Sequence, residues 1–149
     1  MKYLLKMVSL LVLSSLFTST IRADGFDEVQ EWRRRTRLPL FKEDPKMTQF
    51  ALKKARYRAE RDLQNNHKGP RPPKGWKEGT GEAKPFWGWL TCEMECDFQF
   101  VGAGMCVGKN GLRYMVFVGR GGSGRPLISR HNIPTYDTSY LTPNPPKVK

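Results

Sequence analysis

The chain has 149 residues, with 26 Lys or Arg against 14 Asp or Glu and a formal net charge of +12. This length suits a single domain, because domains usually hold about 100 to 200 residues. Apart from an N-terminal stretch, no apolar run approaches the ~20 residues of a membrane-spanning helix, which excludes a multi-pass membrane protein. Three cysteines are too few for a disulfide scaffold and too scattered for a four-ligand zinc site.

The first 23 residues have the pattern of a secretory signal peptide. Lys2 and Lys6 precede an apolar stretch that ends at Phe17, and Ala23 is a small residue suited to cleavage. We expect cleavage after Ala23, with a site after Thr20 as the alternative. A membrane anchor is the other interpretation, but the apolar run is short for it. Cleavage removes three basic residues and no acidic one, which lowers the net charge from +12 to +9.

Two helices are predicted in the first half of the mature chain. Residues 24–37 begin with a capping aspartate and carry an apolar stripe of Phe26, Val29 and Trp32. A second helix begins near Pro45 or is capped by Thr48. It has small or apolar residues at a spacing of four and basic residues on its other faces, which we interpret as solvated. The spaced residues are Met47, Ala51, Ala55 and Ala59, and the basic ones are Lys53, Lys54, Arg56, Arg58 and Arg61.

The second half of the mature chain is predicted to form a loop, a short helix and two strands. Residues 65–84 are rich in proline and glycine, which is typical of a loop. Residues 86–96 suggest a third helix. Strands are predicted over 98–107 and 112–118, joined by a hairpin at Asn110-Gly111. The second strand is apolar on both faces, which indicates a central strand.

These elements predict an α+β domain over residues 24–124, with helices on a small antiparallel sheet. Ser123 lies in a Gly-Gly-Ser-Gly segment that we interpret as a linker, because the Gly-x-Ser-x-Gly spacing of a nucleophile elbow is absent. Residues 125–149 contain five prolines and are expected to be extended or partly disordered. Leu127-Ile128 could dock on the domain as an extra strand.

The order of several short motifs over about residues 26–120 resembles the CAP superfamily. This superfamily includes the cysteine-rich secretory proteins, antigen 5 and the plant pathogenesis-related 1 proteins. The similarity is to short, divergent secreted bacterial forms of the planctomycete type. The motifs are Leu38-Pro39-Leu40, the alanines of the second helix, Glu78-Gly79-Thr80-Gly81, Trp89-Leu90 and Gly102-Ala103-Gly104.

The resemblance implies a three-layer α-β-α sandwich with a cleft of two histidines and two acidic residues that can hold a divalent metal. His67 matches the first histidine and Glu78 the glutamate, with Glu82 as the alternative if the register shifts. The second histidine, expected after Trp89-Leu90, is absent, and His131 lies in the tail. Because zinc normally needs three or four protein ligands, we expect no bound metal, and zinc remains the alternative.

Other interpretations of these residues stay open. His67 could simply end the second helix, where a partly positive ring suits the helix dipole. A structural disulfide is expected between Cys106 and either Cys92 or Cys96, because export makes a bridge permissible and no Cys-x-x-Cys redox motif is present.

The basic charge is concentrated in one part of the chain. Of the 23 basic residues of the mature chain, 15 lie between Arg33 and Lys77. This density fits a solvated surface or an attraction to anionic polymers of the cell envelope. No nucleic-acid-binding signature accompanies it, so specific nucleic-acid binding is not expected.

We therefore expect a secreted or periplasmic, non-enzymatic CAP-like domain that binds an extracellular or envelope ligand. The alternatives are a metal-assisted hydrolase that uses His67 and Glu78, and a cationic protein that adheres to anionic envelope polymers. The sequence leaves the identity of the ligand and the oligomeric state open.

Overall fold

The computed structural model describes residues 25–65, 67–84, 89 and 91–129. The expected signal peptide and the C-terminal tail from residue 130 lie outside the described residues. The elements in chain order are α2 (Gly25–Arg35), β1 (Lys42–Glu43), α3 (Pro45–Glu60), β2 (Lys77–Ala83), β3 (Phe100–Val107) and β4 (Arg113–Arg120).

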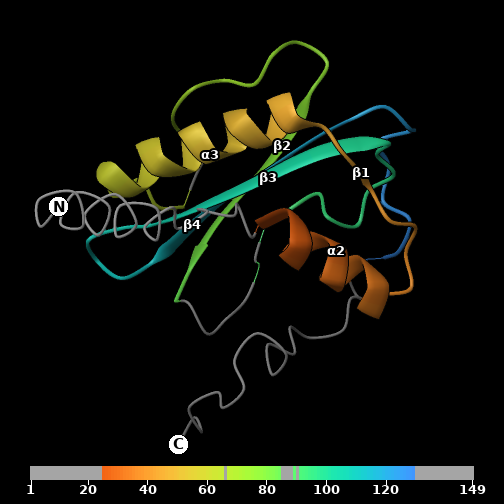
Figure 1. The fold of residues 1–149 in the computed structure, drawn as a ribbon, viewed down its shortest axis with the longest axis horizontal. Helices are drawn as coiled ribbons and strands as arrows, with labels where there is room; N and C mark the ends of the chain where they lie inside the picture. Colours follow the sequence, from red (N-terminus) through yellow and green to blue (C-terminus); the bar gives the residue numbers. More distant parts are fainter. Residues whose placement is uncertain (1–24, 66, 85–88, 90, 130–149) are drawn as a thin grey trace, which may run out of the picture.

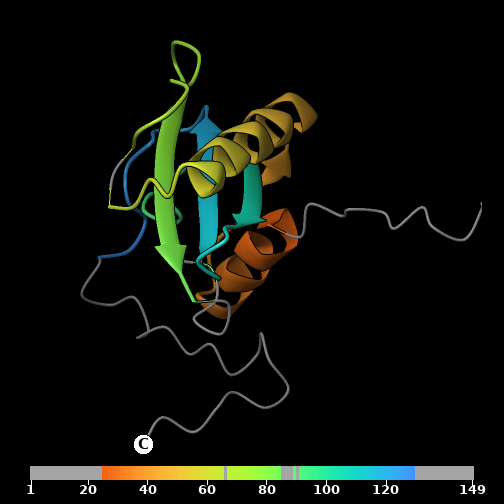
Figure 2. The same cartoon turned by 90° about the vertical axis from the view of Figure 1, so that its left-hand side faces the viewer.

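The strands form one four-stranded sheet in the order β1-β3-β4-β2. The pairs β3–β4 and β4–β2 are antiparallel, whereas β1 pairs with β3 in parallel. The α+β prediction is confirmed, but the sheet is mixed rather than purely antiparallel. The short β1 was not predicted because two residues carry no periodicity. Strand β4 is central, as predicted, and β2 forms the edge beside it (Figure 2).

A helix covers each face of the sheet, α3 on one side and α2 on the other (Figure 1). Alternate residues of β4 point to the two sides. Met115 and Phe117 join a core cluster with Val29 and Trp32 of α2. Val116 and Val118 join a second cluster with residues of α3, which are Met47, Ala51 and Ala55. The predicted apolar stripes therefore both face the sheet.

Helix α3 begins at Pro45, with Asp44 as its cap. Asp44 Oδ1 accepts a hydrogen bond of 2.9 Å from the backbone N–H of Lys46, which satisfies one donor of the first turn. Thr48, the alternative cap, is already inside the helix and donates to Glu43. The start near Pro45 is thus confirmed.

Strand β2 was not predicted, because the segment that holds it was interpreted as a loop. Its sequence, Lys77–Ala83, has glycine at two positions and a single apolar residue, so it lacks the alternation of a half-buried strand. All seven residues nevertheless pair with β4, from Lys77 opposite Gly119 to Ala83 opposite Arg113. The third helix is not seen in its described part, because residues 92–95 form turns; residues 85–88 and 90 lie outside the described residues.

The segment after β4 is held against the domain instead of behaving as a linker. The side chain of Asp97 accepts the backbone N–H of Ser123, and its carbonyl accepts that of Gly124, at 2.9 and 2.8 Å. Further on, the N–H of Leu127 donates to the carbonyl of Glu95 at 2.9 Å, and Ile128 packs against the α2-side core. The start of the predicted tail, through residue 129, therefore contributes to the packed structure.

Helix α3 lies unusually close to β3 because two glycines of that strand face it. A Cβ placed on Gly102 would lie 2.1 Å from the backbone of Met47. One on Gly104 would lie 2.3 Å from the backbone nitrogen of Leu52. Since backbone atoms cannot move aside cheaply, the strand needs glycine at both positions for this contact.

We predict that Gly104→Ala lowers the free energy of unfolding by about 1–3 kcal/mol or more, because the added methyl group would push α3 off the sheet. Val107→Ala on the same strand is the control, since Val107 is 54% exposed and such changes usually cost within about 0.5 kcal/mol. Urea denaturation measures both. Equal effects of the two substitutions would contradict the close contact.

Candidate functional site

Four chemically active side chains from separate segments meet where α3 passes the edge strand. Lys54 comes from α3, His67 from the loop that follows it, Glu78 from β2, and Cys92 from the turn before β3. We call this set the Lys54 cluster. The strand pairing directs Glu78 towards α3, because its β4 neighbour is Val118, which belongs to the α3-side core.

Lys54 is the central residue of this cluster. Its side chain is 1% exposed, and that of Glu78 is 7% exposed. The ammonium Nζ donates to Glu78 Oε2 at 2.7 Å, to Glu78 Oε1 at 2.8 Å and to the His67 carbonyl at 3.0 Å. All three protons of the ammonium group therefore have acceptors, which is the condition under which a buried charge is tolerated.

His67 lies between the carboxylate and the thiol. Its Nδ1 is 3.0 Å from Glu78 Oε1, and its Nε2 is 4.0 Å from Cys92 Sγ. Both Glu78 oxygens accept hydrogen bonds from Lys54, as an ionised carboxylate does. Because such a carboxylate has no proton to donate, its hydrogen bond with His67 requires a proton on Nδ1. In the neutral ring, Nε2 then presents its lone pair to Cys92.

A second ion pair lies one helical turn further along α3. Arg58, fully buried, donates to Glu82 Oε2 at 2.8 Å and to the carbonyls of Leu63 and Met115. Glu82 also accepts the backbone N–H of Asn65. Glu82 is therefore part of the frame beside the cluster, not a member of it.

The structure brings together His67 and Glu78, as the resemblance implied. It also corrects the interpretation of α3, because Lys54 and Arg58 were expected on a solvated face and both are buried. The sequence offered one signal for them: Lys54 lies three residues after Ala51, and Arg58 three residues after Ala55, so each adjoins the buried stripe of the helix. Cys92 had no such signal, since it lies far from His67 and Glu78 along the chain.

Glu78 has little capacity left for a metal ion. The Lys54 ammonium already contacts both oxygens, and an internal cation there would repel an incoming one. Within residues 25–65, 67–84, 89 and 91–129, no three His, Cys, Asp or Glu side chains are grouped as metal ligands. The residues thus do not fit a zinc site of three or four protein ligands.

The three cysteines are unpaired in the structure and lie in different surroundings. Cys92 and Cys106 are partly exposed, and Cys96 is buried. Burial, followed by the hydrogen bond to Glu93, raises the pKa of the Cys96 thiol from 9.0 to about 12. None of the expected disulfide bridges is present.

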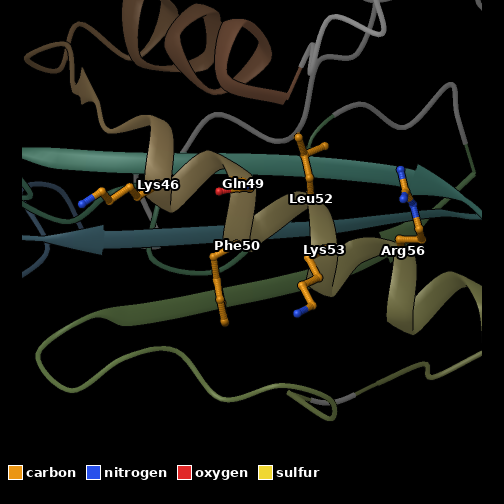
Figure 3. A pocket seen from close by; sticks show the side chains of 6 residues that line it. All are labelled: Lys46, Gln49, Phe50, Leu52, Lys53 and Arg56. Atoms are coloured by element: carbon orange, nitrogen blue, oxygen red, sulfur yellow. The ribbon is translucent and has the colours of Figure 1, made fainter.

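A second feature lies on the outer face of α3, which carries a surface hollow of about 580 Å³. We call it the basic hollow; its lining residues are Lys46, Gln49, Phe50, Leu52, Lys53 and Arg56 (Figure 3). Phe50 meets Trp76 edge-on, with ring centroids 6.0 Å apart. None of these six residues is acidic, so the hollow attracts anions.

Comparison with known proteins identified no matching family model and no curated relative. In the part of the chain that the structure describes, no helix combines the length and apolarity required to cross a bilayer.

We predict that Lys54→Met lowers the free energy of unfolding by about 3–5 kcal/mol, because it leaves the buried Glu78 carboxylate without its cation. Lys53→Met, at the adjacent exposed position, is the matched control. The double variant Lys54→Met/Glu78→Gln should recover part of the loss, since it removes both charges. Chemical denaturation of the three variants measures this. A Lys54→Met variant as stable as Lys53→Met would show that the buried ion pair does not stabilise the fold.

The raised pKa of Cys96 predicts that its thiol resists modification in the folded protein. At pH 8 almost none of a thiol with a pKa of about 12 is ionised, and the thiolate is the reactive form. Aromatic disulfide reagents should therefore modify Cys96 only after urea unfolding, as peptide mass spectrometry can show. Rapid labelling of Cys96 in the native state would contradict its burial.

Proposed function

We propose that the mature chain is an exported, CAP-like binding domain that attaches to an anionic polymer through the basic hollow. The observation that carries this proposal is the hollow itself, which places Lys46, Lys53 and Arg56 around a space of about 580 Å³. Three cations spread along one helix match the repeating charge of a polymer better than a single small anion. The net charge of +9 after cleavage favours the same partner.

The CAP resemblance is supported by the arrangement of the elements and by one contact. A helix on each face of a four-stranded sheet fits the expected α-β-α layers. The hydrogen-bond distance between His67 and Glu78 fits the expected cleft. The export that we propose rests on the N-terminal sequence pattern.

The metal-assisted hydrolase is less well supported than binding. Its glutamate, Glu78, is occupied by Lys54, and its second histidine is absent. Binding in the basic hollow, by contrast, needs only the charges and the apolar surface that line it.

We predict that the protein binds linear polyphosphate and that three substitutions in the hollow weaken this binding. The three substitutions are Lys46→Gln, Lys53→Gln and Arg56→Gln. Each lost phosphate contact should reduce the slope of log affinity against log salt by about 0.7, the value for a single-stranded nucleic acid, or roughly 2 in total. Fluorescence anisotropy over a salt series measures the slope.

The control is a second triple variant with the same change in net charge at exposed positions outside the hollow. Its substitutions are Arg37→Gln, Lys109→Gln and Arg125→Gln. If both triple variants lose affinity equally, net charge alone accounts for the binding and the hollow is not the site.

A further inference from the structure

Cys92, His67 and Glu78 follow one another in the order of a thiol, a base and an orienting acid. The sulfur lies 4.0 Å from His67 Nε2, and His67 Nδ1 lies 3.0 Å from Glu78 Oε1. A nucleophile, a base that can take its proton and a third group that orients the base are the arrangement that activates catalytic cysteines. Such hydrogen bonds are often long before substrate binds, so the sulfur distance is compatible with this role.

The orientation of the His67 imidazole is fixed by groups on the side away from Cys92. Lys54 keeps Glu78 in place by contacting both of its oxygens, and it also binds the backbone carbonyl of His67. Both the ring partner and the main chain of His67 are thus attached to one buried ammonium. Preorganised supports of this kind distinguish a built site from a chance contact on the surface.

The backbone of β2 leaves room for the thiol to reach the histidine. A Cβ on Gly79 would lie 2.0 Å from the carbonyl oxygen of Cys92, so any larger residue would displace the turn that carries the thiol. Glycine at position 79 therefore allows the turn that carries Cys92 to lie against β2, beside Glu78.

The site is open to solvent on the side of the imidazole. The side chain of His67 is 56% exposed, and Cys92 is partly exposed. The other two thiols are in different settings: Cys96 is buried, and Cys106 contacts the carbonyl of Val107 at 3.8 Å. Among the described residues, His67 is the only histidine, and it faces Cys92.

We propose that Cys92, His67 and Glu78 form a nucleophilic thiol site that accepts an acyl group from an activated ester. His67 takes the proton of the Cys92 thiol, and the thiolate attacks the ester carbonyl carbon. A C–S bond forms, the C–O bond to the leaving group breaks, and His67 returns the proton to the leaving oxygen. Water, deprotonated by His67, then attacks the thioester carbonyl carbon. A C–O bond forms, the C–S bond breaks, the carboxylic acid leaves, and the Cys92 thiolate recovers its proton from His67, with no change of oxidation state.

This inference goes beyond the proposed function and does not depend on it, because the Lys54 cluster and the basic hollow share no residue. Polymer binding uses Lys46, Lys53 and Arg56 on the outer side of α3, whereas Lys54 points to the sheet side.

The test is acylation of the full chain by p-nitrophenyl acetate under reducing conditions. Released p-nitrophenolate measures the first step, and peptide mass spectrometry identifies the acetylated cysteine. We expect acetylation of Cys92 at least about tenfold faster than of Cys106, and His67→Gln should lower the Cys92 rate by about 10²-fold, the usual contribution of a general base. Cys106→Ser is the control that should leave p-nitrophenolate release unchanged, whereas Cys92→Ser should abolish its rapid phase.

Glu78 is tested as a positioning residue by comparing two variants. Glu78→Gln should slow Cys92 acetylation because the ring of His67 loses its carboxylate partner, and Glu78→Asp, which keeps a carboxylate, should recover part of the rate. His67→Gln and Cys92→Ser decide the proposal even where Glu78→Gln fails to fold, since both residues are partly exposed. Equal acetylation of Cys92 and Cys106, or a His67→Gln variant that reacts like the native chain, would overturn it.

Discussion

The Lys54–Glu78 ion pair is the interaction on which the rest of the structure depends. Removing two charges from water is costly, and it is tolerated only where the geometry satisfies both groups. Here the ammonium has three acceptors, drawn from the strand and from the loop after α3. The pair therefore joins a central helix, an edge strand and a connecting segment at one point.

This pair explains how an edge strand with little apolar surface is held beneath α3. Strand β2 has Ala83 as its single apolar side chain, so it offers little hydrophobic area to the helix. Its hydrogen bonds to β4 fix it in the sheet, and Glu78 and Glu82 attach it to Lys54 and Arg58. Apolar packing holds α3 to β3 and β4, whereas charge holds it to β2.

The elements that could be predicted are those whose burial follows apolar periodicity. Helices α2 and α3 and strands β3 and β4 each bury a regular set of apolar residues, and these predictions are confirmed. Strand β2 contains two glycines and is tied to α3 by its two carboxylates, a pattern that is indistinguishable from a loop in the sequence. Lys54 was likewise assigned to solvent, because its burial depends on Glu78, a partner 24 residues away.

The candidate site was predictable to the extent that a resemblance supplied it. His67 and Glu78 were named from their motif positions, and they meet at 3.0 Å. Cys92 was considered only as half of a disulfide, because sequence spacing shows nothing of the fold that brings a turn over Gly79. Contacts of this kind arise from topology, since β2 and the turn before β3 become neighbours only once the sheet has formed.

The two ion pairs also restrict how the length of α3 can vary during evolution. One residue inserted between Asp44 and Lys54 would rotate everything beyond it by about 100° and advance it by about 1.5 Å. Lys54 and Arg58 would both turn away from their carboxylates, and the alanines would leave the glycines of β3. The stretch between the cap and the two cations must therefore keep its residue count.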